Sequence, residues 1–261
     1  MISLAEDLRH AVDPVAFAAD RLGLALDDLQ ARFARSTSQF VILNCCRQWG
    51  KSTTTAMVAL HQAKFTPGSL ILLISPSLRQ SRELFSKVMT FLRKLEPVEE
   101  LMEDNKSSAT LLNGSRIVSL PSDPDTIRGF SAPALIIEDE SGFVDDSVNA
   151  ALLPMLAVSG GRMMLLSTPN GRRGHFFDSW TKGGARWQRF TAKATDCPRY
   201  TLDFLDGVKA VTPDWTFRQE YMCEFLDSNT QIFGSSLIDR AVSANVKPLF
   251  TIEQAEAIGL I

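Results

Sequence analysis

Residues 44–53, which read Asn-Cys-Cys-Arg-Gln-Trp-Gly-Lys-Ser-Thr, have the residue types of a loop that binds the phosphates of a nucleotide. Backbone N–H groups at a helix N-terminus attract an anion, and the helix dipole strengthens that attraction. The Lys51 ammonium would neutralise the β- and γ-phosphates, and the Ser52 hydroxyl would bind Mg²⁺. Gly50 has no side chain, so the backbone could approach the phosphates closely. We therefore expect nucleotide phosphates and a magnesium ion at this loop.

The setting of this loop supports that chemistry. An apolar run at residues 40–43 precedes it and a run of good helix formers at residues 54–60 follows it. A strand, a tight loop and a helix are therefore expected in that order. One position departs from the general pattern G-x-x-x-x-G-K-[ST], because Cys45 stands where the first glycine belongs. The alternative is an ordinary strand-to-helix turn that contains Gly-Lys-Ser by chance, and the later stretches of the chain weigh against it.

Three consecutive acids, Glu138, Asp139 and Glu140, follow a second apolar run at residues 134–137. Nucleotide hydrolysis needs acids opposite a phosphate loop, because one carboxylate holds the Mg²⁺ shell and another polarises the attacking water. Strand alternation would put Glu138 and Glu140 on one side of the strand and Asp139 on the other, if the strand continues that far. A solvated acidic strand end is the alternative. The phosphate loop upstream favours the catalytic interpretation.

Polar residues elsewhere could complete such a site. Residues 167–171, Ser-Thr-Pro-Asn-Gly, follow a buried run at residues 163–166, and ligands collect where the strands of an open α/β sheet end. Gln30 lies on a predicted helix, where it is either a solvated residue or an amide that pairs with adenine. The basic residues on one side of the predicted helix at residues 78–95 are expected to form a solvated face. They are Arg79, Arg82, Lys87, Arg93 and Lys94.

The apolar pattern predicts the elements that position these residues. Continuous apolar runs separated by helical stretches are typical of an α/β fold with a mostly parallel sheet covered on both faces. Helices are predicted over most of residues 1–35, and residues 109–120 predict a β-hairpin around Asn113-Gly114. Pro154 should bend or end the helix of residues 145–156. Further strands are expected at residues 70–74 and 186–191, and further helices at residues 175–180 and 214–225.

Composition sets limits on the class of protein. The chain has 261 residues, of which 45% are hydrophobic and 22% are charged, so it can form a substantial globular core. No apolar run approaches the roughly 18 residues needed to cross a bilayer, and the acidic N-terminus lacks a signal-peptide pattern. The four cysteines show no disulfide or zinc spacing, so a reducing cytosol is expected. A net charge of −3 argues against constitutive tight DNA binding, although it is compatible with local basic patches.

These motifs together resemble those of the ATPase domain of large terminase subunits, the DNA-packaging motors of tailed phages. The family's phosphate loop is similar to (G/S)-R-Q-x-G-K-(S/T), which needs no glycine at Cys45 and which residues 46–52 match apart from Cys46. The family's Walker B strand ends in Asp-Glu, like residues 139–140, and its coupling motif resembles residues 167–171. The resemblance covers roughly residues 22–240.

The resemblance implies a RecA-like P-loop NTPase fold and a set of site residues. It assigns the metal to Ser52 and Asp139, the catalytic base to Glu140 and a trans-acting catalytic arginine to Arg128. Glu138 departs from the family, which usually has an apolar residue before the Asp-Glu pair. The implied nucleotide-binding residues are Gln30, which would read adenine, and Arg47, Gln48, Trp49, Gly50, Lys51, Ser52 and Thr53. The implied coupling residues are Ser167, Thr168 and Asn170.

The implied function is Mg²⁺-dependent ATP hydrolysis that drives double-stranded viral DNA into a procapsid, in the cytoplasm of an infected bacterial host. The implied partners are the DNA, a portal protein, a small terminase subunit and further copies of the chain in a ring. The isolated chain would be a monomer, with no membrane involved. The basic pairs at residues 93–94 and 172–173 are candidate DNA contacts. Two alternatives stay open: another P-loop DNA translocase or helicase, and a regulatory ATP-binding subunit without turnover.

The resemblance also implies a domain plan. Residues 1–195 would form the ATPase core, with a helical segment at residues 1–35, and residues 196–240 would form a lid that includes residues 217–225. Residues 241–261 would be a tail or linker where the family's nuclease domain begins. We therefore expect no nuclease activity from this chain.

Overall fold

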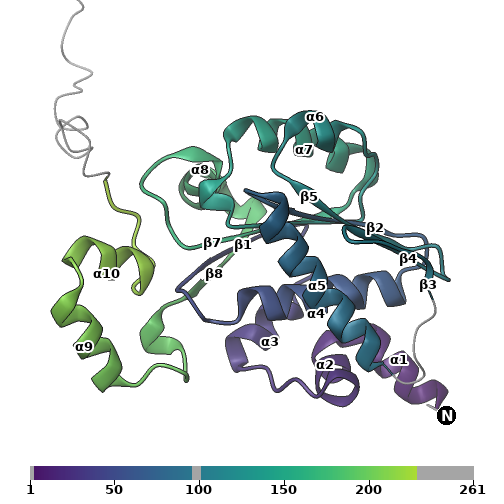
Figure 1. The fold of residues 1–261 in the computed structure, drawn as a ribbon, viewed down its shortest axis with the longest axis horizontal. Coiled ribbons are helices and arrows are strands. Elements are labelled where there is room, and N and C mark those ends of the chain that lie inside the picture. The colour runs from purple at the N-terminus through teal and green to yellow at the C-terminus, as the bar shows by residue number, and fades with distance from the viewer. Residues whose placement is uncertain (1–2, 96–100, 228–261) are drawn as a thin grey trace, which may run out of the picture. The chain divides into compact units, whose positions relative to one another are not determined.

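An eight-stranded sheet lies at the centre of the residues that the computed structural model describes, 3–95 and 101–227 (Figure 1). Its strands are β1 (Phe40–Cys45), β2 (Leu70–Ser75), β3 (Leu101–Asp104), β4 (Ser108–Leu111), β5 (Arg116–Pro121), β6 (Leu135–Asp139), β7 (Arg162–Ser167) and β8 (Trp187–Ala192). The strand order is β3-β4-β5-β2-β6-β7-β1-β8. Neighbours from β5 to β8 in that order pair in parallel, whereas β3–β4 and β4–β5 are antiparallel.

The central strands are buried on both faces, which explains their continuous apolar runs. Every residue of β1 and of β6 is buried, and so is every residue of β2 after Leu70 and of β7 after Arg162. Parallel strands of this kind have helices on both sides and therefore show no alternation of apolar and polar residues. The prediction of a mostly parallel α/β sheet is confirmed.

Helices cover both faces of the sheet (Figure 1). One apolar core includes side chains of α2 to α5, and the other includes side chains of α6 to α8. The helices that precede or cover the sheet are α1 (Leu4–Val12), α2 (Pro14–Leu22), α3 (Asp28–Ala34), α4 (Lys51–Phe65), α5 (Leu78–Lys94), α6 (Pro124–Arg128), α7 (Asp146–Ser159) and α8 (Gly174–Lys182). Short 3-10 helices are η1 (Ser141–Phe143), η2 (Gly184–Arg186) and η3 (Ala194–Asp196), and α9 (Leu202–Val211) and α10 (Asp214–Glu220) come last.

Several elements differ from the expectation, among them the helices α6 and α9, which the apolar pattern does not predict. Strand β3 was not predicted, because its short sequence, Leu-Met-Glu-Asp, is largely exposed at the edge of the sheet and has no apolar run. Helix α7 does not end at Pro154 but continues to Ser159. Pro154 is exposed, so water can hydrogen-bond to the carbonyl group that the proline leaves without a donor.

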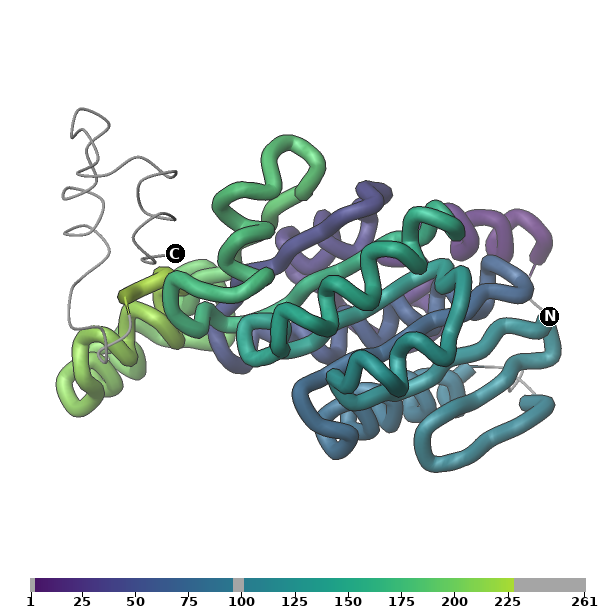
Figure 2. Tube along the Cα trace, turned by 90° about the horizontal axis from the view of Figure 1, so that it is seen from above, coloured from purple at the N-terminus to yellow at the C-terminus, as the bar shows by residue number. Residues whose placement is uncertain are grey.

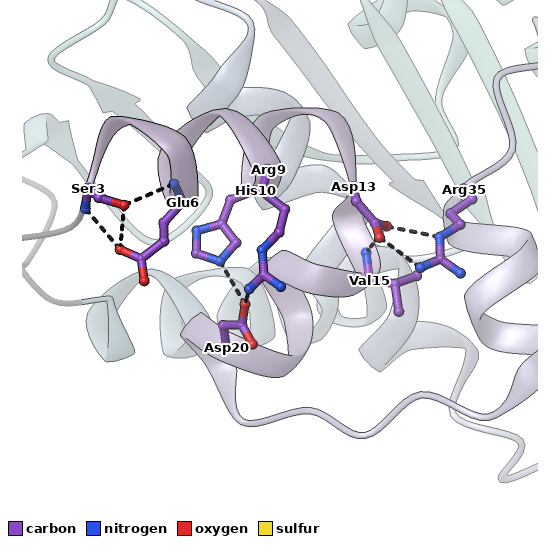
Figure 3. A network of polar contacts seen from close by, with 8 residues as sticks. All are labelled: Ser3, Glu6, Arg9, His10, Asp13, Val15, Asp20 and Arg35. Atoms are coloured by element: carbon purple, nitrogen blue, oxygen red, sulfur yellow. Dashed lines mark hydrogen bonds and ion pairs between the residues drawn. The ribbon is translucent and has the colours of Figure 1, made fainter.

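Polar contacts join the three N-terminal helices (Figure 3). Asp20 on α2 pairs with Arg9 and with His10 Nε2, both on α1, the second at 2.9 Å. Asp13 caps the start of α2 and lies 2.7 Å from Arg35 at the end of α3. The two arginine–aspartate pairs are largely exposed and contribute about 0–1 kcal/mol each. The buried apolar side chains between the helices therefore supply most of the stability of this segment.

The last two helices lie at the opposite end of the described part from α1, as both views show (Figures 1 and 2). They belong to the same compact unit, which runs through Leu226. The predicted boundaries at residues 195 and 240 stay predictions. The end of the predicted lid and the predicted tail, residues 228–261, lie outside the described residues. Within the described part, no helix is both long enough and apolar enough to cross a membrane.

Candidate active site

The phosphate loop joins β1 to α4, in the order that the sequence predicts. Gly50 occupies the N-cap position of α4 with φ 97° and ψ 17°, a left-handed conformation that favours glycine. A Cβ atom on residue 50 would lie 2.9 Å from Gln30 Nε2, so the space behind the loop also excludes a side chain. Among the described residues, no side chain caps this end of α4. An anion can therefore accept hydrogen bonds from the N–H groups of its first turn.

Lys51 and Ser52 contact the two acids at the end of β6. Lys51 Nζ lies 2.5 Å from Glu140 Oε1 and 4.0 Å from Asp139 Oδ1. Ser52 Oγ donates a hydrogen bond to Asp139 Oδ2 at 3.3 Å. The fold thus brings together four side chains that the sequence predicts for one site from two separate stretches.

Burial and charge together set the protonation of this cluster. Burial raises the pKa of the Asp139 carboxyl group, and the positive charge of Lys51 opposes that rise. Burial alone would lower the pKa of Lys51, but the negative charges around it, among them Asp139 and Glu140, more than offset burial and raise that pKa. Lys51 is therefore protonated near neutral pH, as a phosphate-binding cation must be.

The backbone turns sharply after the acidic strand. β6 ends at Asp139, and Glu140 has φ 57° and ψ 38°, a left-handed conformation that is uncommon for residues other than glycine. The predicted alternation therefore stops at Asp139, and Glu140 does not share a side with Glu138. Glu138 is fully buried and contacts His175, whereas Glu140 contacts Lys51.

Arginine and tyrosine side chains that the sequence did not indicate hold the backbone of the loop. Arg199 donates to the carbonyl groups of Trp49 and Gln48, the second at 3.2 Å. Tyr200 Oη donates to the Arg47 carbonyl at 2.7 Å. These partners are 150 or more positions apart in the chain, so no local pattern could reveal them.

Gln30 uses both ends of its amide on backbone groups. Its Nε2 donates to the Trp49 carbonyl at 2.9 Å, and its Oε1 accepts from the Asp27 N–H at 3.1 Å. The Trp49 side chain is buried, with its ring edge-on to Phe33. Adenine recognition by Gln30 stays a prediction, and each end of the amide keeps one further hydrogen-bonding position.

A cavity of about 270 Å³ lies beside the phosphate loop. Arg47 borders it, and its guanidinium Nε donates to Glu220 Oε2 at 2.5 Å, so α10 is tied to the loop. The residues that line the cavity are Arg47, Gln48, Gly50, Lys51, Ser52, Thr53, Lys87 and Glu140. Six of the eight predicted nucleotide-binding residues therefore surround one hollow.

Part of the basic face of α5 also belongs to the site. A second cavity of about 350 Å³ is lined by Arg79 and Lys87 together with Ser52, Asp139 and Glu140. Lys87 borders both cavities. Both cations are exposed, as expected of a solvated face, and they also border the cavities beside the site. A helical pattern of charges does not show which exposed charges lie next to a site.

Arg128 lies apart from both of these cavities. It is the last residue of α6, and its Nη1 lies 2.8 Å from Asp125 Oδ1. The exposed fraction of the two side chains is 62% for Arg128 and 89% for Asp125. A trans-acting role stays a prediction, and the exposure of Arg128 is compatible with contact to another subunit.

The predicted coupling residues follow β7 and contact the segment after Glu140. Ser167 and Thr168 are buried, and Asn170 Nδ2 donates to the Gly142 carbonyl at 2.9 Å. A Cβ atom on residue 142 would lie 3.0 Å from Ser167 Oγ, so η1 packs closely on these residues. The coupling residues therefore touch the turn that carries the candidate base.

The four cysteines, Cys45, Cys46, Cys197 and Cys223, are buried free thiols. Burial raises the pKa of Cys46 to about 12 and raises the pKa of Cys45 and Cys223 as well. Such thiols are poor nucleophiles and poor metal ligands. The cysteine at the first position of the loop pattern is part of the core rather than of the chemistry.

Magnesium fits the oxygen atoms at this site. Ser52 Oγ and Asp139 Oδ2 are adjacent hard donors, and Mg²⁺ in phosphate sites takes one or two protein oxygens together with phosphate oxygens and water. Among the described residues there is no group of three or more His, Cys, Asp or Glu side chains that could hold a metal ion. The phosphates of a bound nucleotide would therefore have to supply part of the coordination shell.

A mostly parallel sheet, a glycine-lysine-serine loop between β1 and α4, and two acids facing that loop place the chain in the class of RecA-like P-loop NTPases. Within that class the match is more specific. Residues 42–240 match the family model described as terminase large subunit, T4likevirus-type, N-terminal, and the chain belongs to this family.

Individual relatives agree with this assignment. The chain is 25% identical over 249 residues to the large terminase subunit of Thermus phage G20c, and the match covers 82% of this chain and 51% of that protein. The chain thus spans about half the length of the curated relatives it matches. The large terminase ATPase domain of Thermus phage P74-26 matches with a TM-score of 0.72 at 24% identity, over 80% of this chain and 97% of that chain. The large terminase of bacteriophage D6E in complex with ADP matches with a TM-score of 0.63 at 10% identity, over 77% and 54%.

Proposed function

We propose that this chain hydrolyses Mg²⁺-ATP and that hydrolysis drives double-stranded viral DNA into a procapsid. The observation that carries the proposal is the contact of Lys51 with Asp139 and Glu140, which joins a phosphate-binding cation to the acids that hydrolysis needs. Membership of the large-terminase family supports the packaging role. The ADP bound by the D6E relative supports an adenine nucleotide as the ligand.

Each residue of the cluster has a separate role in this proposal. Lys51 and the N–H groups of α4 bind the phosphates, and Ser52 with Asp139 would hold Mg²⁺, which neutralises charge on the phosphoryl oxygens. Glu140 orients a water molecule and accepts its proton. Lys87, which borders the same cavity, adds a further positive charge.

The ion pair between Lys51 and Glu140 regulates the base in this scheme. While Glu140 accepts a hydrogen bond from Lys51, one of its oxygens is occupied. Phosphate oxygens compete with Glu140 for Lys51, so nucleotide binding frees the carboxylate for water. Glu140 can then activate water only when a nucleotide is bound.

The finer parts of the proposal concern partners and surroundings. Arg128 acts on the nucleotide of a neighbouring subunit in a ring, and Ser167, Thr168 and Asn170 couple the state of the site to movement of the DNA. The partners are double-stranded DNA, a portal protein and a small terminase subunit, in the cytoplasm of an infected bacterium. The exposure of Arg128 and the contact of Asn170 with Gly142 support the first two statements.

The test measures ATP turnover by the purified chain alone, with duplex DNA, and with procapsids that carry the portal protein. We expect slow turnover by the chain alone and faster turnover with both partners. Lys51→Ala is the inactive control. Tight ATP binding without turnover in all three conditions would favour a regulatory subunit, and strand separation without stimulation by procapsids would favour a helicase.

A further inference from the structure

Glu138 is a fully buried carboxylate inside an apolar core. It pairs in register with Leu165 on β7, and Leu165 and Ile136 belong to the core that α7 and α8 cover. A buried carboxylate is costly unless charged or hydrogen-bonding partners surround it. The partners of Glu138 therefore indicate what the residue does.

Among the described residues Glu138 Oε1 has two partners, both from segments next to the candidate active site, whereas Oε2 is buried without one. Ser141 Oγ donates to Glu138 Oε1 at 2.5 Å, and His175 Nε2 lies 2.6 Å from the same oxygen. His175 Nε2 also lies 3.0 Å from Ser141 Oγ, so the three side chains contact each other. We call Glu138, Ser141 and His175 the turn network.

The second nitrogen of His175 completes the charge balance. His175 Nδ1 lies 3.3 Å from Asp146 Oδ1, and the same oxygen accepts from the His175 N–H at 2.6 Å. Both ring nitrogens thus face carboxylate oxygens, and only the imidazolium form donates from both. A buried pair of opposite charges therefore joins β6 to the first turn of α8, and Asp146 adds the first turn of α7.

The turn network spans the residue that would act as the base. Glu138 and Ser141 lie on either side of Asp139 and Glu140, and their hydrogen bond closes this segment. Glu140 adopts a left-handed conformation, which is unfavourable for an L-residue and persists only where the surroundings hold it. The carbonyl of Glu140 also accepts from the Phe143 N–H at 2.9 Å, which fixes the far side of the turn.

We propose that Glu138, Ser141 and His175 are positioning residues that hold the turn at Glu140 and so direct its carboxylate to the phosphate loop. This inference rests on the proposed function, in which Glu140 is the base. His175 comes from α8, directly after the basic pair at residues 172–173. A movement of α8 would therefore change the position of the Glu140 carboxylate through the same three side chains.

The test compares variants that break the network with one that preserves it. Ser141→Ala removes one hydroxyl, and the double variant Glu138→Leu/His175→Leu replaces the buried charges with apolar side chains of suitable size. Glu138→Gln keeps the size and an accepting oxygen. Ser119→Ala is the matched control, because Ser119 is a buried serine on β5 whose Oγ has no hydrogen-bond partner among the described residues.

A positioning role predicts a specific pattern in the kinetics. Ser141→Ala and the double variant should lower kcat by about 10- to 100-fold, because a misplaced base loses its alignment with the attacking water. Their affinity for a non-hydrolysable ATP analogue should stay at the wild-type value, since the network does not touch the phosphate loop. Glu138→Gln should keep most of the wild-type turnover, and Ser119→Ala should match the wild type.

A crystal structure of the double variant gives a second measurement that does not depend on turnover. We expect Glu140 to leave its positive φ and to lose its contact with Lys51. The proposal is overturned if Glu140 keeps both in that structure, or if kcat is unchanged in the folded double variant. Absence of ATP turnover in the wild type would instead refute the proposed function, and the crystal structure would still decide the positioning role.

Discussion

Lys51 Nζ lies 2.5 Å from Glu140 Oε1, so the cation that would bind phosphate is paired with the carboxylate that would activate water. The two residues are 89 positions apart in the chain. The pair is partly buried, with 13% of the Lys51 side chain and 25% of the Glu140 side chain exposed. The ion pair therefore occupies both the cation that would bind phosphate and the carboxylate that would bind water, until a phosphate competes for Lys51.

We expect Lys51→Ala to abolish measurable ATP hydrolysis. The substitution removes the positive charge from the phosphates and leaves the Glu140 carboxylate without its partner. Steady-state turnover of the purified variant checks this, with circular dichroism to show that the chain is folded. Lys182→Ala is a matched control, because Lys182 lies on α8 in an exposed pair with Asp178. Wild-type turnover by Lys51→Ala would refute the central assignment.

We expect Glu140→Gln to keep nucleotide binding and to lower the hydrolysis rate by about 10²-fold or more, because the amide cannot accept the proton of the water. Single-turnover measurements with equilibrium binding of ATP separate the two effects. Glu138→Gln is the comparison, and its effect should be much smaller. The reverse order of effects would place the base one residue earlier in the chain.

We expect Arg128 to act on the nucleotide of a neighbouring subunit. An added guanidinium at the transferred phosphoryl group is worth about 10³–10⁵ in rate, whereas the exposed pair with Asp125 is worth about 0–1 kcal/mol. Arg128→Ala and Lys51→Ala should each be inactive alone and should regain activity when mixed. Asp125→Asn should leave turnover unchanged. Activity of the wild type should rise with protein concentration, and a constant specific rate without rescue on mixing would contradict a trans role.

The stability of the folded chain should depend on pH through His175. Burial opposes protonation of this histidine, but its bonds and charge interactions with Glu138 and Asp146 outweigh burial and raise its pKa above the ordinary value of 6.5. A group with a raised folded pKa contributes stability that is complete below its unfolded pKa and is lost as pH rises through the folded pKa. The free energy of unfolding of the wild type relative to His175→Gln should therefore be largest below pH 6.5 and should shrink at higher pH.

His61 provides a control of opposite sign for this measurement. Burial lowers its pKa below the ordinary value of 6.5, so its contribution should be present at higher pH and should be lost as pH falls. Denaturant unfolding of His175→Gln and His61→Gln over a pH series, each compared with the wild type, checks both signs. Equal pH dependence of the two variants would show that the charge on His175 does not stabilise the fold.

The sequence predicts the centre of the site well because local patterns encode it. A buried run, a glycine, a lysine and a helix must form a strand, a tight loop and a helix N-terminus, so Gly50 and Lys51 could be placed before the fold was known. The acids at residues 139–140 end a buried strand, and the carboxyl ends of parallel strands meet at one edge of a sheet. The parallel sheet itself follows from the apolar runs.

Tertiary contacts decide the rest. The bonds of Arg199 and Tyr200 to the loop join residues far apart in the chain, and no periodicity marks either residue. Lys87 follows the helical pattern of a solvated charge, and only the packing of α5 brings it beside the phosphate loop. Glu138 departs from the apolar pattern of its strand, and the reason for a buried acid there is evident only from its contact with His175.

The burial of all four thiols has a practical consequence for measuring motion in this chain. A thiolate attacks a maleimide reagent, and burial keeps Cys45, Cys46 and Cys223 protonated and out of reach. A single new thiol on an exposed helix, such as Lys182→Cys on α8, should then be the fastest site to react. The chain could carry one fluorescent dye at a chosen position with its native cysteines intact, which single-molecule recordings of α8 would require.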